Sequence, residues 1–394
     1  MSSNNSSKLH VANTLFRNGH YKEALPLYVE LNRQYPQLSA YRIALENCIL
    51  NIEQDIEQVN GHVVRDEVKY APYEETIHPS SHNIADVDTL FVVVTPVLNG
   101  VEYLATTLES VLSQNGGFFI DYIIKDGGSS DGTIKLVQEW CENIRKGHYP
   151  LRCQGIRIAL HSGPDTGLYD AVKQGFAVRK LSDDDIMTYI NADDVIANNA
   201  FETVKNVLRT VPNASWINGQ PNVIDENGNT FQKPSFPLAY NRYDILDGLH
   251  DGRHLYFIQQ EGSFWLGKLY KQAKGINSDL RLAGDFDLWR RFAAITDPLT
   301  TNVNLASFRK REGQLSAQID NYYLEVDKLT EYANTSTTTY DAPKTQVGAP
   351  SAFFNAKHIP NPDCRIQRPG AVCFLNQSGY PHEVVYLTRT WLNY

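Results

Sequence analysis

Residues 187–195 read MTYINADDV, a short apolar run that stops at two adjacent carboxylates, Asp193 and Asp194. Such a run is typical of a buried parallel strand, and open α/β sheets bind ligands at the carboxyl ends of their strands. Two neighbouring acids repel each other unless a hard divalent cation binds between them and takes oxygen ligands. The alternative interpretation is an Asp that caps a helix starting near Asn198, with the other Asp in solvent.

The composition is that of an ordinary globular chain: 394 residues, 42% hydrophobic, with a net charge of -9. The acidic balance argues against general nucleic-acid binding, because no basic stripe can displace counterions. No apolar run approaches the ~20 residues that span a bilayer, and the polar N-terminus lacks a secretory signal. The cysteines are five, scattered and without a CxxC pair, which predicts no zinc or disulfide framework and fits a reducing cytoplasm. They are Cys48, Cys141, Cys153, Cys364 and Cys373.

The first 55 residues show a helical period, with expected helices over residues 9–16, over residues 21–35 and from about 39 to 51. This segment resembles a tetratricopeptide unit, because Gly19, Tyr21, Ala24, Tyr28 and Pro36 fall at that repeat's spacing. About one and a half repeats are visible, fewer than the roughly three of a stable solenoid. The segment is therefore either a docking module for a protein partner or a second copy, or a helical pair without such a role. Residues 56–88 are expected to be a linker.

Residues 89–195 alternate short apolar runs with helical patterns. We expect strands over 90–94, 122–124, 156–160 and 186–190, with helices after each of the first three. This alternation predicts an α/β fold with a mostly parallel sheet. After residue 195 we expect a helix over 199–209, a strand over 215–218, a hairpin with an Asn227-Gly228 turn, and a helix that begins near Asp285. Residues 334–394 are expected to be irregular, with a short strand or helix near 384–392.

Seven segments in this order resemble the family 2 glycosyltransferases of the GT-A fold, which occur in bacterial polysaccharide pathways. The resemblance covers residues 89–333, with a nucleotide-binding half (89–195) and an acceptor-binding half (196–333). Residues 334–394 form an extension of unknown role. The matching segments are VVVTPVLNG, DYIIKDGGSSDGT, SGPDTGLYDAVKQGF, YINADD, IQQEGSFW, LRLAGDFDLWRRFA and FRKREGQLS.

The resemblance implies a nucleotide-sugar donor, most simply a UDP-sugar, and Mn²⁺ or Mg²⁺ held at Asp193 and Asp194. The metal would neutralise charge on the leaving diphosphate. Arg309 and Arg311 match a late basic loop over the diphosphate, and Arg suits phosphate through its planar fork; the alternative is a solvated loop. The other residues implied in donor binding are Thr95, Pro96, Asn99, Asp126, Asp165, Tyr169, Asp170, Asn191 and Asp193. For Asp126, Asp165 and Asp170 the alternative role is capping a turn or a helix.

Asp285 matches the catalytic carboxylate, which would take the proton of an acceptor hydroxyl in an inverting displacement. Asp287 competes for this role, but positions two apart do not share a helix face. Gln260, Glu261 and Trp265 match the acceptor side, although core packing is the alternative for Trp265 and Trp289.

Three positions depart from the family pattern and indicate an unusual sugar or a weaker grip on the metal. Asn191 replaces the first acid of the DxD motif, Gly163 replaces an acid two residues before Asp165, and Lys173-Gln174 replaces Asn-Lys. The acceptor is expected to be a saccharide or a lipid-linked saccharide, met in the cytoplasm or at the inner face of the membrane.

Two other classes of function remain open. One is a non-catalytic adaptor built on a degenerate transferase domain, against which the intact Asp193, Asp194 and Asp285 argue. The other is a sugar nucleotidyltransferase, but the loop TPVLNGVEYL after the first strand lacks the basic residue that a triphosphate needs.

Overall fold

A computed structural model describes residues 8, 11–16, 18, 20–34, 73–77, 89–146, 148–234, 237–335, 357–359, 370–376 and 379–387. The chain divides into two compact units, residues 1–70 and 71–394. In the first unit, residues 11–16 form a helix and α2 spans Tyr21–Gln34. The two helices bury Ala12, Ala24, Tyr28 and Leu31. The helical pair is thus confirmed, the tetratricopeptide assignment stays a prediction, and the third expected helix lies outside the described residues.

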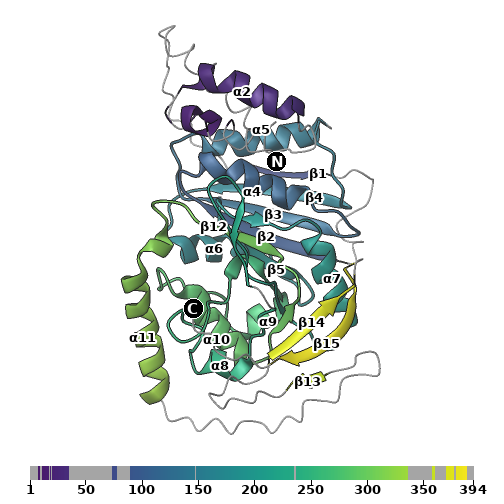
Figure 1. Ribbon diagram of the computed structural model, residues 1–394, viewed down its shortest axis with the longest axis vertical. Coiled ribbons are helices and arrows are strands. Elements are labelled where there is room, and N and C mark those ends of the chain that lie inside the picture. Colours follow the sequence, from purple (N-terminus) through teal and green to yellow (C-terminus); the bar gives the residue numbers. More distant parts are fainter. Residues whose placement is uncertain are drawn as a thin grey trace. The chain divides into compact units, whose positions relative to one another are not determined.

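The second unit is built on a large mixed sheet with the strand order β1-β4-β3-β2-β5-β10-β7-β11-β14-β15-β13 (Figure 1). Strands β4, β3, β2 and β5 are mutually parallel, which confirms the α/β prediction and its mostly parallel sheet. The first half of the unit supplies β1 (Tyr73–Ile77), β2 (Leu90–Val97), β3 (Phe119–Asp126), β4 (Gly155–Ser162) and β5 (Ile186–Tyr189). The second half supplies β7 (Trp216–Asn218), β10 (Ser263–Leu266), β11 (Leu299–Thr301), β13 (Lys357–Ile359), β14 (Gly370–Leu375) and β15 (Pro381–Leu387).

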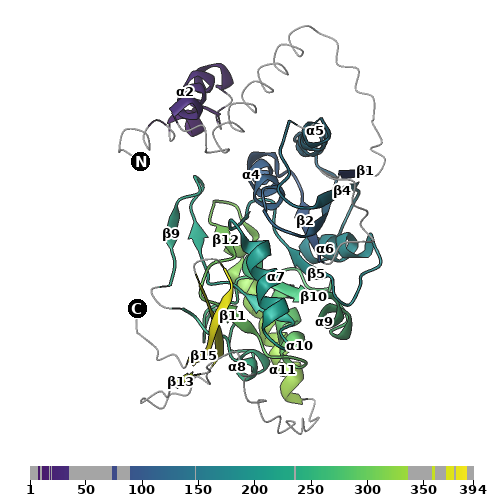
Figure 2. The same ribbon diagram turned by 90° about the vertical axis from the view of Figure 1, so that its right-hand side faces the viewer.

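Helices cover both faces of this sheet because β2 is apolar on both. Val92 and Val94 pack with Val172 of α6, whereas Phe91 stacks on Phe201 of α7 with ring centroids 4.3 Å apart. Figure 2 shows α4 and α6 on opposite sides of β2. The helices of the unit are α4 (Val101–Leu112), α5 (Thr133–Arg145), α6 (Leu168–Ala177), α7 (Ala200–Thr210), α8 (Arg242–Leu246), α9 (Gly267–Gln272), α10 (Gly284–Ala293) and α11 (Ile319–Thr335).

A four-stranded sheet, in the order β6-β12-β8-β9, lies after the end of β5 in the chain. Its strands are β6 (Val195–Ile196), β8 (Val223–Ile224), β9 (Thr230–Gln232) and β12 (Ala306–Arg309). The expected hairpin is confirmed: β8 and β9 pair antiparallel, and Gly228 takes the left-handed conformation in the turn between them. Because β12 pairs with both β6 and β8, Arg309 is brought beside the residues that follow β5.

Two segments expected to be irregular contain strands, and the short terminal strand expected near residues 384–392 is partly confirmed, because β15 spans Pro381–Leu387. Residues 73–77, expected within a linker, form β1, which pairs antiparallel with β4 and extends the edge of the sheet. In the C-terminal extension, β14 continues the sheet in parallel with β11, and β15 and β13 follow it. In both cases short segments obtain their backbone partners from strands far away in sequence, and local periodicity does not report such partners.

Candidate functional site

The acids after β5 lie where the parallel strand meets β12, and they differ sharply in environment. Asp194 has no exposed surface. Its Oδ1 accepts a hydrogen bond from the backbone N–H of Arg309 at 2.7 Å, and its Oδ2 accepts one from Asn191 Nδ2 at 3.0 Å. Burial raises the pKa of this carboxyl, and the neighbouring Glu261 and Asp193 raise it further. Asp194 therefore joins β12 to the end of β5, and its predicted role as a metal ligand does not fit these contacts.

The side chain of Asp193 is instead hydrogen-bonded by the loop that follows β12. Its Oδ2 accepts hydrogen bonds from Arg311 Nε at 2.7 Å and from Gln314 Nε2 at 3.2 Å. Its backbone carbonyl accepts one from Arg309 Nε at 2.7 Å. Both guanidinium groups lie over the ring of Tyr103, at 5.1 Å for Arg309 and 5.5 Å for Arg311. The structure thus brings the predicted basic loop to the predicted metal-binding acid, and it adds Tyr103, which the sequence pattern did not indicate.

Arg309 and Arg311 have different surroundings. Arg309 is buried, and its Nη1 donates to the carbonyls of Asp225 and Glu226, 3.1 and 3.0 Å away, in the β8–β9 turn. Arg311 is half-buried, and its hydrogen bond to a carboxylate is the one to Asp193. Arg309 therefore stabilises the fold around the site, whereas Arg311 is the residue with freedom to meet a phosphate.

Asp285 begins α10 and lies beside Tyr169 of α6. The Tyr169 hydroxyl is 3.1 Å from Asp285 Oδ1 and 2.9 Å from the carbonyl of Leu282. The ring of Tyr169 packs on Gly284, where an added Cβ would lie 2.6 Å from the ring. Burial raises the pKa of Asp285, against hydrogen bonds from Phe286 N–H and Tyr169 that lower it. Tyr169 is buried and positions Asp285, which leaves its predicted contact with the donor without exposed surface.

The competing acid on the same helix points elsewhere. Asp287 Oδ2 accepts hydrogen bonds from Arg291 Nη2 at 2.6 Å and Nε at 3.0 Å, one helical turn further on. The two acids thus occupy different faces of α10, as their spacing predicted. Burial raises the pKa of Glu261, and the negative charges of Asp285 and Asp193, but not that of Asp287, are among the further causes.

Two residues predicted to bind the donor base are covered by the fold. Thr95 has no exposed surface, and its Oγ1 lies 2.9 Å from the hydroxyl of Tyr122. Pro96 is also buried, because β2 continues to Val97. The exposed positions at this strand end are Leu98, which is 62% exposed, and Asn99. Leu98 was missed, although an apolar residue directly before Asn-Gly was the available signal.

The loop after β3 is organised by Asp126. This buried carboxylate accepts hydrogen bonds from the N–H groups of Gly128 and Ser129 and from Ser162 Oγ at 2.6 Å. These contacts make it a turn-capping residue, and its role in base binding stays a prediction. Asn99 closes the same edge, because its Oδ1 accepts a hydrogen bond from Ser130 N–H at 2.9 Å.

The loop after β4 brings Asp165 close to that edge. Asp165 Oδ1 accepts a hydrogen bond from Gly167 N–H at 3.1 Å, and its Oδ2 lies 3.4 Å from Nζ of the buried Lys125. Asp170 accepts a hydrogen bond from Thr166 N–H at 2.9 Å and so caps α6. Lys125 was not predicted, since a single Lys at a strand end carries no pattern.

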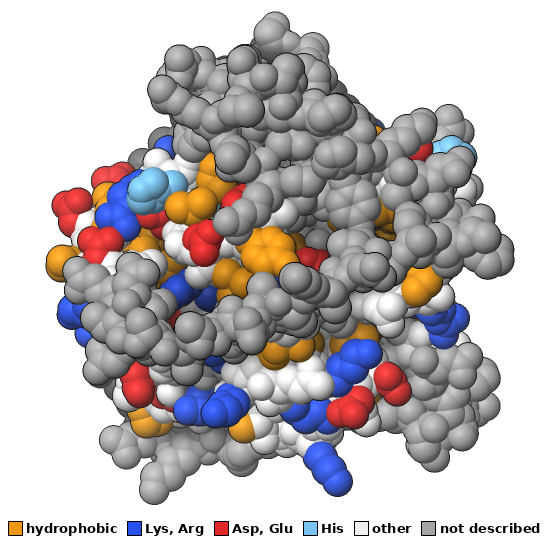
Figure 3. Space-filling model, turned by 90° about the horizontal axis from the view of Figure 1, so that it is seen from below, with side chains coloured by type: hydrophobic (Ala, Val, Ile, Leu, Met, Phe, Trp, Pro, Cys, Tyr) orange, Lys and Arg blue, Asp and Glu red, His pale blue; other side chains and the backbone are white. Residues whose placement is uncertain are grey.

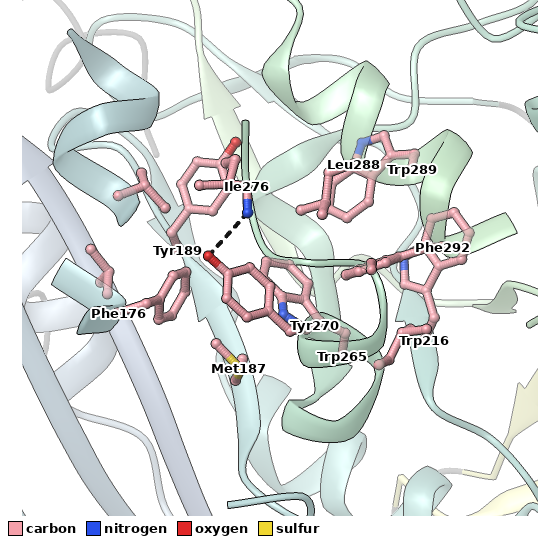
Figure 4. Close-up of a cluster of buried hydrophobic side chains, with 14 of the residues drawn as sticks. Phe176, Met187, Tyr189, Trp216, Trp265, Tyr270, Ile276, Leu288, Trp289 and Phe292 are labelled. Carbon is pink, nitrogen blue, oxygen red and sulfur yellow. Dashed lines mark hydrogen bonds between the residues drawn. The ribbon is translucent and has the colours of Figure 1, made fainter. Parts of the chain in front are cut away.

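The acceptor-side residues predicted from the IQQEGSFW segment are all buried. Gln260 Nε2 donates to the carbonyl of Tyr189 at 2.5 Å, and burial raises the pKa of Glu261 to about 7. Trp265 has no exposed surface and packs edge-on against Trp289, with ring centroids 5.6 Å apart (Figure 4). Its assignment to acceptor binding is therefore wrong, because β10 is a central strand covered by helices on the Trp265 side.

The oxygen atoms of the residues that follow β5 can be compared with the ligands that a divalent cation requires. Asn191 Oδ1 is buried and accepts no hydrogen bond from any described residue, and Asp193 carries the adjacent carboxylate. Within the described part of the chain, no group of three or more His, Cys, Asp or Glu side chains could hold a metal ion. Mg²⁺ is commonly held by one or two carboxylates together with substrate phosphates. The residues fit a cation that obtains most of its ligands from a bound diphosphate.

A family model and two curated relatives show similarity to glycosyltransferases. The model of "Glycosyl transferase family 2" matches residues 92–264. A PGL/p-HBAD biosynthesis glycosyltransferase of Mycobacterium bovis is 29% identical over 105 residues, which are 27% of this chain and 36% of that protein. An uncharacterized glycosyltransferase of Rickettsia conorii is 23% identical over 249 residues, 61% of this chain and 37% of that protein. The chain thus spans little more than a third of the length of these relatives.

Two solved structures align with about three fifths of this chain, at TM-scores below 0.5. The Staphylococcus aureus TarS fragment 1–349 in complex with UDP-GlcNAc aligns with 62% of this chain and 66% of its own, at a TM-score of 0.45 and 14% identity. The mannosyltransferase PcManGT of Pyrobaculum calidifontis, in complex with GDP-Man and Mn²⁺, aligns with 60% of this chain and 58% of its own, at a TM-score of 0.36 and 13% identity. In the described residues of this chain, no helix is long and apolar enough to cross a membrane.

Proposed function

We propose that this protein, whose residues 92–264 match the model of glycosyl transferase family 2, is an inverting, metal-dependent transferase. It takes a sugar from a nucleotide-sugar donor, most simply a UDP-sugar, to a saccharide or lipid-linked saccharide in bacterial surface polysaccharide synthesis. The observation that carries the proposal is that two acids are held by separate elements: Arg311 and Gln314 of the loop after β12 hydrogen-bond Asp193, and Tyr169 of α6 hydrogen-bonds Asp285 in the first turn of α10. One acid belongs to the donor diphosphate and the other to the acceptor hydroxyl.

Asp285 is the proposed general base. The acceptor oxygen forms a bond to the sugar C1 while the bond from C1 to the diphosphate oxygen breaks, and the hydroxyl proton passes to Asp285. Burial raises the pKa of Asp285 towards the working pH, which makes the carboxylate a better proton acceptor. Tyr169 fixes Asp285 through its hydroxyl, so the base meets the acceptor in one orientation.

Asp193 and Asn191 are the residues that would hold a divalent cation, and the cation would supply positive charge to the leaving diphosphate. Arg311 and Gln314 hydrogen-bond Asp193 in the structure, and the same side chains can turn to phosphate oxygens. We assign the exposed Leu98 and Asn99 and the half-buried Asp165 to the expected base pocket. The helical pair of residues 1–55 is proposed to bind a protein partner or a second copy.

The test is release of free nucleotide from a panel of UDP-, GDP-, dTDP- and CMP-sugars, with MnCl₂ or EDTA. We expect turnover of one donor that EDTA abolishes. Asp285→Asn should lower kcat about 10²–10⁴-fold, the usual contribution of a general base. Asp287→Asn is the matched control on the same helix and should retain activity, because Asp287 pairs with Arg291.

Three results would count against the proposal. Equal loss of activity in Asp285→Asn and Asp287→Asn would remove the assignment of the base. Turnover that EDTA does not affect would contradict the proposed dependence on a metal ion. Silence across the panel, without donor binding by calorimetry, would favour the adaptor.

A further inference from the structure

One exposed and two half-buried aromatic side chains gather on the loop before η2 (Gln260–Gly262) and at the start of α11. Phe257 is 45% exposed, and its ring meets that of Tyr322 edge-on with centroids 5.6 Å apart. Tyr322 meets Tyr323 in the same manner at 5.5 Å. We call Phe257, Tyr322 and Tyr323 the aromatic platform. An exposed Phe anchored by a second ring presents a rigid apolar face at small entropic cost.

The platform adjoins the proposed base. Tyr322 packs against Ala283 and Phe286, the residues near Asp285 at the start of α10. Burial raises the pKa of the Tyr322 hydroxyl, and the negative charge of Asp285 raises it further. Because Ala283 and Phe286 flank Asp285 in the chain, a molecule stacked on Phe257 and Tyr322 lies beside the start of α10.

A cavity of about 400 Å³ continues from the platform, a volume in the usual range of small-molecule sites. Arg253 connects the two: its guanidinium lies 4.4 Å over the ring of Tyr323 and binds Asp251 at 2.9 Å and Asp327 at 2.5 Å. Tyr323, Asp327 and Thr330 share one face of α11, since they are four and three residues apart. The cavity is lined by Asp247, Gly248, Leu249, Asp251, Arg253, His254, Asp327 and Thr330.

The chemistry of this surface favours an uncharged, hydroxyl-rich ligand. The positive charge of Arg253 is compensated by two carboxylates, so the cavity offers no free cation to a phosphate. Its lining includes one large aliphatic side chain, Leu249, which is too little for a lipid tail. On the α11 side of Figure 3, histidine, basic and acidic side chains lie beside hydrophobic ones. Carbohydrates use both kinds of surface: hydroxyls bond polar groups and the C–H face of the ring stacks on aromatics.

We propose that the acceptor is an oligosaccharide of at least two units, and that it binds along this surface. The reacting sugar stacks on Phe257 and Tyr322 with a hydroxyl directed at Asp285, and the next sugar occupies the cavity that Arg253 and His254 line. This inference rests on the proposed transferase function, because that function gives Asp285 its acceptor.

The experiment measures saccharide binding directly. Fluorescently labelled full-length protein is applied to an array printed with maltose, cellobiose, lactose, chitobiose and their monosaccharides, with and without UDP and MnCl₂. We expect at least one disaccharide to be retained more strongly than its monosaccharides. For that disaccharide, Phe257→Ala should weaken binding about tenfold or more, the equivalent of one buried apolar side chain. His254→Ala should weaken it about two- to tenfold, as expected for one hydrogen bond.

The matched control is Phe231→Ala, which removes a ring of similar exposure (52%) from β9 and should bind as wild type. All three positions are exposed, so the variants should fold. The proposal is overturned if no saccharide is retained, or if Phe257→Ala binds as tightly as wild type. Dissociation of an oligomer in Phe257→Ala, without saccharide binding to wild type, would instead identify a contact between copies.

The readout involves no donor turnover. Disaccharide binding that Phe257→Ala weakens, together with silence in the nucleotide-release assay and no donor binding by calorimetry, would therefore refute the proposed transfer and leave a saccharide-binding surface without an acceptor role.

Discussion

Gly284→Ala tests whether the close contact between α10 and Tyr169 places the base. Gly284 is the first residue of α10, and Ala in a helix is normally more stable than Gly by up to about 1 kcal/mol. Here the added Cβ would lie 2.6 Å from Cγ and Cδ2 of Tyr169, where ordinary contact begins at 3.4 Å. The ring is buried, and its hydroxyl is bound to Asp285 and Leu282, so it cannot rotate away freely.

The contact therefore outweighs helix propensity. Overpacking of this kind typically costs about 1–3 kcal/mol, and the ring or α10 must move by roughly 1 Å. A displacement of about 1 Å at a reacting group can cost on the order of 10²-fold in rate. We expect Gly284→Ala to lower Tm by a few degrees and kcat by about 10–10²-fold, with a smaller change in donor KM.

The assays are thermal unfolding followed by circular dichroism and the nucleotide-release assay with the donor found active. Gly117→Ala is the control, because its added Cβ would meet Lys205 Nζ at an ordinary 3.7 Å. This variant should have the same Tm and kcat as the wild type. A Gly284→Ala protein with higher Tm and unchanged kcat would refute the packing argument and the role of Tyr169.

Further predictions concern the charged and aromatic residues around the site. Burial raises the pKa of Glu261 to about 7, so the folded protein favours the neutral form of this side chain. Glu261→Gln should therefore become more stable than wild type as the pH rises from about 4.5 to about 7, by up to about 3 kcal/mol. Equal Tm–pH profiles of the two proteins would contradict this. Arg309→Ala should destabilise by about 3–5 kcal/mol in urea unfolding, whereas Arg311→Ala should cost less than about 1 kcal/mol and raise donor KM; the reverse order would exchange their roles. Trp265→Phe should lower Tm and leave acceptor KM unchanged, since this indole lies in the core; a raised acceptor KM at constant Tm would restore it to the site.

Residue patterns predicted most elements of the second unit because their signals are local. β5, the hairpin with the Asn227-Gly228 turn and the start of α10 at Gly284 all follow from apolar period, turn residues and caps within a few positions. The strands of β1 and β14 were missed because their partners, β4 and β11, are remote in sequence. A segment of five or six residues becomes a strand when a neighbour offers hydrogen-bonding groups.

The same distinction between local patterns and long-range contacts applies to the predicted site residues. Asp193, Asp285 and Arg311 were chosen by residue type and spacing, and the structure pairs Asp193 with Arg311 and places Asp285 in the first turn of α10. Thr95, Asp194 and Trp265 were chosen in the same way and are buried. Adjacent residues such as Asp193 and Asp194 look alike in sequence, but the chain turns one towards Arg311 and the other into the core.

The sequence by itself determined the alternating α/β order and the acids that follow β5 and lie in the first turn of α10, because these depend on residue type at short range. Only the tertiary structure decided that Asp193 pairs with Arg311 while Asp194 is buried, that Tyr169 holds Asp285, and that Arg253 joins an aromatic platform to a cavity. The physical reason is that burial and hydrogen-bond partnership are set by elements more than a hundred residues apart, as in Asp194 with Arg309 and Tyr169 with Asp285.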